Sequence, residues 1–185
     1  MMSAFYEFEL HDKTCKLIPF NRQFLIENPC STYMTWFHNP IITRYNSHGL
    51  FPYTEKQKEE FLDSLDTATN KIIMAIVYDS IHVGNVSLQS IDWINRSAEI
   101  AIILDNDYHG KGIGTEACKK MLEHGFLKMN LNRIWTGTAS INVGMRHVAA
   151  SIGMRPEGVF REAIYLDGSY YDVNEYGILR SEYVG

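Results

Sequence analysis

Three alternating glycines, Gly110, Gly112 and Gly114, precede an amphipathic segment in the stretch YHGKGIGTEACKKMLEHGF. Glycines at a strand-to-helix junction let the backbone approach a phosphate closely. The first turn of a helix offers four unpaired N–H donors and about half a positive charge, which together suit an anion. Lys111 adds a cation beside them. The residues therefore predict a diphosphate site, with a glycine-rich turn that binds no ligand as the alternative.

The glycine spacing excludes two common phosphate sites. A dinucleotide site needs G-x-G-x-x-G in a strand–helix–strand unit with parallel strands. Here the third glycine comes too early, and the preceding strands are expected to be antiparallel. A P-loop needs G-x-x-x-x-G-K-[ST], but Lys111 is followed by Gly112. The remaining interpretation is an anion bound by successive backbone N–H groups at the start of the helix.

The hydrophobic periodicity predicts the elements that hold these glycines. The expected strands are residues 14–20, 71–79, 82–94, 97–105 and 133–140, followed by a C-terminal hairpin that turns at Asp167 and Gly168. The expected helices are residues 22–37, interrupted by NPCS, a helix capped by Thr54 and Gln57, one from the glycines to about residue 129, and residues 142–153. This order predicts an α+β (mixed α/β) fold, with a mostly antiparallel central sheet flanked by about four helices in a single domain, 1–185.

Composition limits the partners and the location. The formal charge is −5, which argues against a nucleic-acid partner because such proteins usually present a basic face. The three cysteines are widely spaced with no CxxC pair, so we expect no metal site and a reducing compartment. No apolar run reaches the length needed to span a bilayer. We therefore expect a cytoplasmic protein with no membrane partner.

Two motifs in order resemble the acyl-CoA signature of the GNAT superfamily of N-acetyltransferases. In YHGKGIGTEA, His109 stands at the Q/R position of Q/R-x-x-G-x-G/A, Gly112 at the first glycine and Gly114 at the last. In ASINVGMRHVAASIGMRPEG, Asn142 opens a helix and the pair 153–154, Gly-Met, stands where relatives carry Gly-Phe. The resemblance covers the chain from about residue 14 to its end. It is closest to the branch with ribosomal-protein, spermidine and amino-sugar-nucleotide acetyltransferases.

This resemblance implies the GNAT fold and the transfer of an acetyl group from acetyl-CoA to a primary amine by direct attack in a ternary complex. It also implies that residues 100–104 splay from residues 134–138, so that pantetheine pairs with the exposed strand edge. The implied cosubstrate-binding residues are Ile102, Ile103, Leu104, His109, Gly110, Lys111, Gly112, Ile113, Gly114, Thr115 and Asn142.

Glu99 is the candidate general base. It stands just upstream of the glycines in an otherwise apolar strand, on the face opposite Ile100. A partly buried carboxylate can accept a proton from an amine, directly or through water. The alternative is a carboxylate at a solvated strand end or paired with Arg96 or Arg133.

The proton donor to the thiolate is left open by the sequence. Many GNAT enzymes carry a tyrosine four residues before the Gly-Phe pair, but this chain has Ala149 there. Water or a tail tyrosine is the remaining donor, and His147 is expected on the surface. The tail tyrosines in question are Tyr165, Tyr170 and Tyr171. Cys118 is expected to be a buried, inert thiol rather than a nucleophile.

The segment STYMTWFHNPIITRYNSHGLFPYT is where relatives hold the acceptor. Its aromatic residues are the candidate substrate-binding residues, with a place in the core as the alternative; they are Trp36, Tyr45, Phe51 and Tyr53. We expect a small-molecule amine acceptor, such as an amino sugar nucleotide. The alternatives are a protein N-terminus and a non-catalytic acyl-CoA-binding module. The tail hairpin also allows a homodimer.

Overall fold

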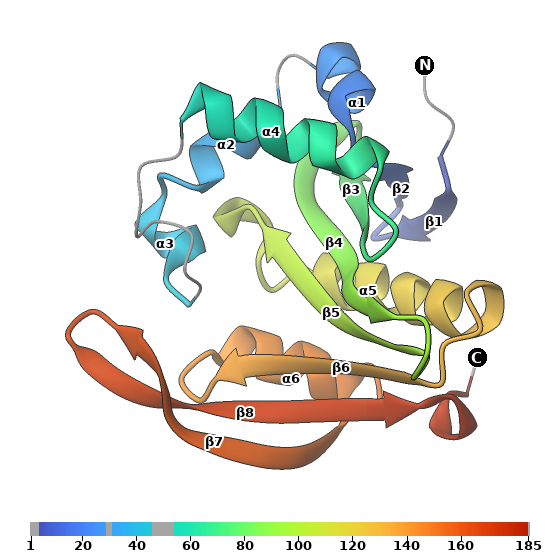
Figure 1. Cartoon of the computed structure of the whole chain (residues 1–185). Helices are drawn as coiled ribbons and strands as arrows, with labels where there is room; N and C mark the ends of the chain where they lie inside the picture. The colour runs from blue at the N-terminus through green and yellow to red at the C-terminus, as the bar shows by residue number, and fades with distance from the viewer. Residues whose placement is uncertain (1–3, 29–30, 46–53, 185) are drawn as a thin grey trace.

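One eight-stranded sheet runs through the residues that the computed structural model describes, 4–28, 31–45 and 54–184 (Figure 1). The strand order is β1-β2-β3-β4-β5-β6-β8-β7, and every neighbouring pair is antiparallel except β5 and β6. The strands are β1 (Tyr6–Leu10), β2 (Lys13–Pro19), β3 (Ile72–Tyr78), β4 (Ile81–Asp92), β5 (Ser97–Leu104), β6 (Arg133–Ala139), β7 (Arg155–Leu166) and β8 (Ser169–Leu179). The predicted mostly antiparallel sheet is confirmed.

Helices cover both faces of the sheet. They are α1 (Arg22–Glu27), α2 (Tyr33–Trp36), α3 (Pro40–Thr43), α4 (Glu55–Asp66), α5 (Ile113–Glu123) and α6 (Val143–Ser151). On one face, α5 and α6 pack against the strands in the larger hydrophobic core. On the other face, α1, α2 and α4 pack against β3 in a second, aromatic core (Figure 1).

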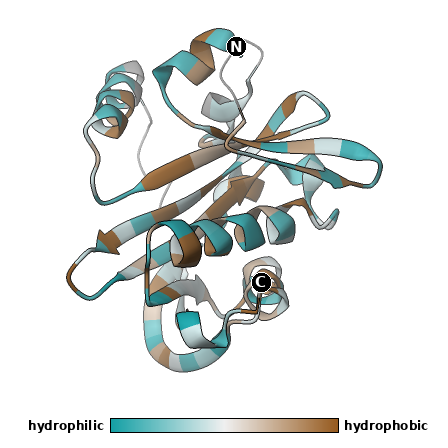
Figure 2. Cartoon of the chain, turned by 90° about the vertical axis from the view of Figure 1, so that its right-hand side faces the viewer, coloured by the Kyte–Doolittle hydropathy of each residue, from teal (hydrophilic) through white to brown (hydrophobic). Residues whose placement is uncertain are grey.

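The two cores follow from alternation along the strands. In β5, Ala98 and Ile100 are completely buried on the α5 side, whereas Glu99 lies on the opposite face. In α5, Ala117 and Met121 are fully buried on the side that meets the sheet. Figure 2 shows hydrophobic residues concentrated on the central strands of the sheet. One face of β5 is therefore core, and the other is available for chemistry.

Two features differ from the prediction. Strand β1 was not expected, and it pairs with β2 through a turn at His11 and Asp12, whose φ angles are 52° and 58°. Turns of this left-handed kind usually contain glycine or asparagine, so the sequence carried no hairpin signal there. The helix expected to reach residue 129 ends as α5 at Glu123 and continues as a π-helix over His124–Lys128.

The predicted capping box at the start of α4 is confirmed. The Gln57 N–H donates to the Thr54 hydroxyl at 3.2 Å, and the Thr54 N–H donates to the Gln57 side-chain oxygen at 2.9 Å. Thr54→Ala removes one of these bonds and should lower the free energy of unfolding by about 1 kcal/mol. Urea denaturation measures the loss. Thr54→Ser keeps the hydroxyl and should stay near wild type, so an equal loss in both variants would contradict the capping role.

Candidate active site

Strands β5 and β6 diverge at the centre of the sheet. Their parallel pairing consists of three residue pairs: Ser97 with Arg133, Ala98 with Ile134, and Glu99 with Trp135. Beyond these pairs β5 continues to Leu104 and β6 to Ala139, each hydrogen-bonded only to its outer neighbour. The splay that the resemblance implied is therefore present from residue 100 in β5 and residue 136 in β6, whereas residues 134 and 135, which were expected to splay as well, still pair with β5. It leaves two backbone edges with which an extended ligand can pair.

The glycine loop at the end of the splayed β5 has the geometry of an anion site. Gly110 and Gly112 have φ angles of 71° and 75°, a conformation that side chains disfavour. Gly112 is the N-cap of α5 and supplies no capping side chain. The first intrahelical bond runs from the Glu116 N–H to the Gly112 carbonyl at 3.0 Å. The N–H groups of the first turn, from Ile113 to Thr115, therefore have no acceptor within the helix.

Three contacts shape this loop. The Nε2–H of His109 donates to the Leu104 carbonyl at 3.0 Å and so closes the loop against the end of β5. Gly114 lies so near β5 that an added Cβ would be 3.1 Å from the Ile102 side chain. The Nε2–H of His11 donates to the Lys111 carbonyl at 3.0 Å. His109, at the Q/R position, thus holds the backbone in place and leaves its Nδ1 for a ligand.

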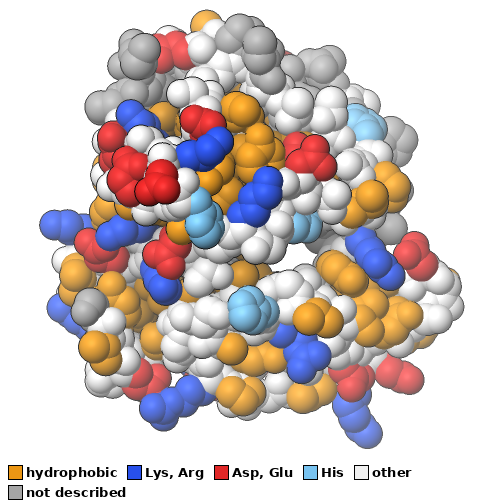
Figure 3. Space-filling view, turned by 180° about the vertical axis from the view of Figure 1, so that it is seen from behind, with side chains coloured by type: hydrophobic (Ala, Val, Ile, Leu, Met, Phe, Trp, Pro, Cys, Tyr) orange, Lys and Arg blue, Asp and Glu red, His pale blue; other side chains and the backbone are white. Residues whose placement is uncertain are grey.

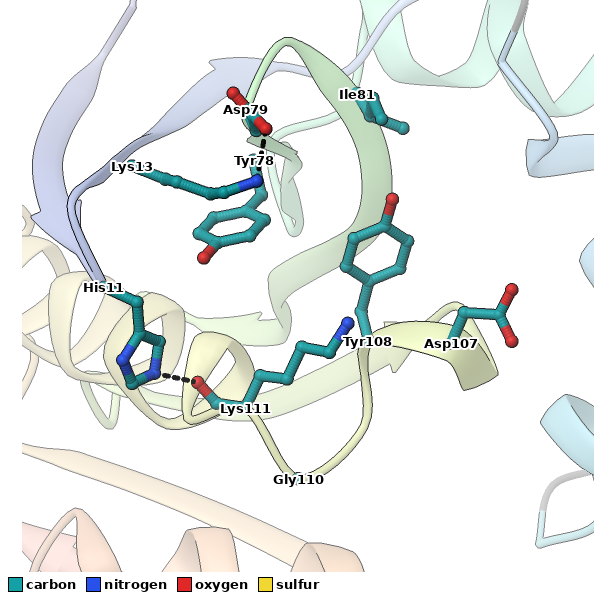
Figure 4. Close-up of a pocket in the computed structure, with 9 residues that line it drawn as sticks. All are labelled: His11, Lys13, Tyr78, Asp79, Ile81, Asp107, Tyr108, Gly110 and Lys111. Carbon is teal, nitrogen blue, oxygen red and sulfur yellow. Dashed lines mark hydrogen bonds and ion pairs between the residues drawn. The ribbon is translucent and has the colours of Figure 1, made fainter.

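A cavity of about 660 Å³ opens beside the loop. It is lined by His11, Lys13, Tyr78, Asp79, Ile81, Asp107, Tyr108, Gly110 and Lys111 (Figure 4). The Lys111 ammonium lies 4.7 Å from the centre of the Tyr108 ring, and Lys13 pairs with Asp79 at 2.5 Å. Lys111 of the glycine loop therefore lines this cavity, together with residues of the β1–β2 and β3–β4 turns.

Asn142 stands at the start of α6, across the splay from the loop. Its side-chain oxygen accepts from the Met145 N–H at 3.1 Å, and its amide donates to the Thr138 hydroxyl at 3.0 Å. The predicted capping role is confirmed, and one amide hydrogen remains for a ligand. On the same helix, Ala149 is fully buried and His147 is exposed, as expected.

Glu99 lies where the splay begins, on the face away from α5. Gln89 donates to its carboxylate at 3.1 Å. Neither arginine of the alternative interpretation pairs with it: Arg96 donates to the Asn130 carbonyl, and Arg133 donates to Glu157. Among the described residues, Glu99 forms no ion pair, so the alternative of a pairing with Arg96 or Arg133 is excluded.

Glu175 is a second carboxylate on this face that the sequence did not single out. It lies on β8 directly opposite Gly137 of β6. Its carboxylate covers Gly137 so closely that an added Cβ would collide with it. Burial raises the pKa of Glu175, and the charge of Glu99 raises that pKa further. Only the strand register brings Glu99 and Glu175 to one face, so no local motif could have found the pair.

The aromatic residues chosen for the acceptor are only partly in place. Trp36 is 1% exposed and belongs to the core, because its indole N–H is held by Thr32 at 3.0 Å and Asp105 at 3.1 Å. It therefore offers no face to an acceptor, and the prediction that Trp36 stacks on the acceptor is wrong. Tyr45 is half-buried with Arg44 5.4 Å from its ring centre. Phe51 and Tyr53 lie outside the described residues.

Cys118 is fully buried in α5, and this burial raises the pKa of its thiol to about 12. At pH 8 only about one molecule in 10⁴ would carry a thiolate there. We expect iodoacetamide to label Cys118 in unfolded but not in native protein, measured by mass spectrometry of its peptide. Cys118→Ala should retain turnover; rapid native labelling or loss of turnover would instead indicate a catalytic thiol.

The sequence profile of the acetyltransferase (GNAT) domain matches residues 28–155 of the chain. The chain belongs to the GNAT acetyltransferase family. It is therefore an acetyl-CoA-dependent N-acetyltransferase of the GNAT type. The matched residues run from α2 through α6 to the start of β7 and include the splay, the glycine loop and Glu99.

Two bacterial relatives show the similarity at the sequence level. YdaF of Bacillus subtilis (strain 168), provisionally named a ribosomal N-acetyltransferase, is 35% identical over 116 residues, which is 63% of each chain. The spermidine N(1)-acetyltransferase of Vibrio cholerae is 30% identical over 147 residues, 75% of this chain and 85% of the relative. The first match thus spans less than two thirds of YdaF, whereas the second spans most of the spermidine enzyme.

Solved GNAT structures agree with the fold. The Vibrio cholerae spermidine N-acetyltransferase in complex with CoA and spermine superposes with a TM-score of 0.80 at 25% identity, over 92% of this chain and 98% of that one. RimL, a ribosomal L7/L12 alpha-N-protein acetyltransferase in complex with CoA, also gives 0.80 but is 17% identical, over 94% and 98%, and so supports the fold alone.

Basic and acidic side chains are interspersed on the face shown in Figure 3. No group of three or more His, Cys, Asp or Glu residues in the described part of the chain is arranged to hold a metal ion. Among the described helices, none has the length and apolar character to cross a membrane.

Proposed function

We propose that this GNAT acetyltransferase acetylates the primary amine of a small cationic molecule. The observation that carries the proposal is the two-sided geometry at the splay. The glycine loop and the free strand edges lie toward one end, and Glu99 and Glu175, which form no ion pair with any described residue, lie on the open face. The first part suits coenzyme A, and the second suits an ammonium group.

In the proposed binding mode, the N–H groups at Gly112–Thr115 hold the diphosphate of acetyl-CoA, with Lys111 adding a positive charge. Asn142 contributes its remaining amide hydrogen from the far side of the splay. Pantetheine extends along the free edge of β5, which places the thioester near Glu99 where the strands meet. A backbone N–H of β5 then stabilises the oxyanion, and one such donor is typically worth about 3–4 kcal/mol.

The proton balance of the transfer is simple. Glu99 takes a proton from the acceptor ammonium, and the neutral nitrogen attacks the thioester carbonyl. The carbon–sulfur bond of the tetrahedral intermediate breaks, and the nitrogen loses a second proton as the amide forms. A water molecule takes this second proton and passes one proton to the departing thiolate, which leaves as CoA thiol, while Glu99 releases its own proton to solvent. With Ala149 buried at the usual tyrosine position, we assign the relay to the thiolate to water.

A thiol-release assay over a panel of acceptors tests this function. The panel holds a polyamine, a simple alkylamine, an amino sugar nucleotide and a peptide with a free N-terminus. We expect acetyl-CoA to be consumed fastest with the cationic small amines, because two carboxylates attract positive charge. Fastest turnover with the sugar nucleotide or the peptide would replace the proposed acceptor class. No turnover with any amine would leave a non-catalytic acyl-CoA-binding module.

The similarity to YdaF favours a protein N-terminus as the second candidate acceptor.

Exposed apolar residues on the β7–β8 hairpin support the proposal that two copies of the chain associate there; they are Val159, Phe160, Tyr165 and Tyr170. The Vibrio cholerae spermidine enzyme has been solved as a dodecamer.

A further inference from the structure

We propose that Glu175 is an acceptor-binding residue, which together with Glu99 forms a two-carboxylate seat for the protonated amine. In this seat Glu175 binds the ammonium, while Glu99 receives its proton. The inference rests on the proposed amine acetylation and adds a residue on β8, outside the segment in which acceptor contacts were expected.

The strand register places the two carboxylates together. Paired residues in neighbouring strands project to the same face of a sheet. Glu99 pairs with Trp135 on β6, and Gly137, two residues further along, projects to the same face. Gly137 pairs in turn with Glu175 on β8. The two side chains therefore flank β6 on the open face, beside the point where β5 and β6 part.

Gly137 leaves the room that this arrangement needs. An added Cβ would collide with the Glu175 carboxylate and would also come within 3.3 Å of Val173. The carboxylate thus lies flat over the β6 backbone instead of pointing away into solvent. This position directs it toward the mouth of the splay, where the acetyl group is proposed to arrive.

The charged groups around Glu99 and Glu175 leave these two carboxylates without a cationic partner among the described residues. Glu99 of β5, Arg133 of β6 and Glu157 of β7 are the charged groups that act on Glu175. Arg133 makes two hydrogen bonds to Glu157, and this pairing lowers the pKa of Glu157. Arg133 is therefore already paired with Glu157. No lysine or arginine among the described residues forms an ion pair with Glu99 or Glu175, so two like charges share a partly buried space.

Two neighbouring carboxylates favour an ammonium ligand for electrostatic reasons. The charge of Glu99 raises the pKa of Glu175, and a bound cation would be attracted to both carboxylates and offset this repulsion. The same field disfavours an acceptor with an anionic group next to its amine. The seat therefore selects alkyl ammonium groups, as in polyamines and simple diamines, over amines adjacent to a phosphate or carboxylate.

The first test is Glu175→Gln, assayed with a diamine and acetyl-CoA. We expect the KM for the amine to rise about 10- to 100-fold, with a smaller change in kcat and an unchanged Kd for CoA. The difference in KM between the variant and wild type should shrink at low pH, because the raised pKa of Glu175 leaves its wild-type carboxyl protonated and uncharged there. A merely structural role would not give this pH dependence.

The second test moves the Glu175 carboxylate without replacing Glu175 itself. Gly137→Ala should push Glu175 aside and raise the KM in the same way, and the double variant should be little worse than either single variant. Gly158→Ala on β7 is the matched control, because a Cβ there has no neighbour within 4 Å. It should leave the kinetics at wild-type values.

Stability gives an independent readout. Since the folded pKa of Glu175 is raised, its carboxylate destabilises the folded state at pH values above that pKa, and stability falls as pH rises through it. Glu175→Gln should therefore have a higher Tm than wild type at pH 8, and the difference should shrink at pH 4. A variant that is more stable and yet binds its acceptor worse is the signature of a binding residue.

The outcomes separate this inference from the proposed function. If the wild-type enzyme is active and its KM for the amine is unchanged in Glu175→Gln and in Gly137→Ala, the seat is overturned and the acetyltransferase function stands. If wild type consumed no acetyl-CoA with any amine, isothermal titration calorimetry with spermidine would still test whether Glu175 binds an amine. Binding to wild type but not to Glu175→Gln supports the seat, and equal binding or none overturns it.

Discussion

Gly112→Asp is expected to abolish measurable binding of coenzyme A while leaving the protein folded. Aspartate tolerates the left-handed backbone found at Gly112 and is a good N-cap, so the start of α5 should remain intact. Its carboxylate would stand where the diphosphate is proposed to bind. Two unit charges 4 Å apart repel by about 4 kcal/mol at an effective dielectric of 20, which corresponds to a loss of about 10³-fold in affinity.

Gly112→Asn is the matched control, because it has the same shape and the same capping ability without the charge. It fills the open space above the loop and competes for the same N–H groups, so we expect a smaller loss of affinity. The ratio of the two Kd values, from isothermal titration with CoA, isolates the charge. Similar affinities for the two variants would show that the diphosphate binds elsewhere.

Glu99→Gln should lower kcat for the amine by about 10²- to 10⁴-fold, the usual contribution of a general base. This corresponds to about 3–5 kcal/mol of barrier. The Kd for CoA should stay unchanged, since Glu99 lies on the face away from the glycine loop's helix. The Gln89 amide that donates to Glu99 can instead meet the carbonyl oxygen of the new side chain, so the fold should be preserved.

Pre-steady-state turnover at several pH values measures this loss directly. Glu60→Gln is the control, because this substitution makes the same chemical change at an exposed residue of α4, far from the splay. If Glu99→Gln turned over its amine as fast as wild type at every pH, water or Glu175 would have to take the proton instead.

The sequence predicted the neighbourhood of the glycine loop well, because local chemistry determines it. Positive φ angles at Gly110 and Gly112, the N-cap at Asn142 and the left-handed turn at Asp167 and Gly168 each require particular residues at particular positions. Strand alternation likewise placed Glu99 opposite the buried Ile100. These signals operate over a few residues and are visible without a structure.

Features that depend on long-range packing were missed or misplaced. Glu175 reaches Glu99 only through the register of β5, β6 and β8, which no local pattern encodes. Trp36 looked available because aromatic residues serve both cores and binding sites. Its indole N–H could instead be buried because Asp105, distant in sequence, accepts from it. The β1 hairpin was missed because His11 and Asp12 are unusual residues for its turn.

The unpaired edge of β5 also makes the half-life of this protein depend on the concentration of acetyl-CoA around it. A sheet with an open seam exposes backbone that proteases and other extended chains can engage. If acetyl-CoA fills the seam as proposed, it stabilises the folded chain by about 2.7 kcal/mol at a concentration 100 times its Kd. Starvation for acetyl units would then shorten the half-life of the enzyme, so that its abundance follows the supply of its own donor.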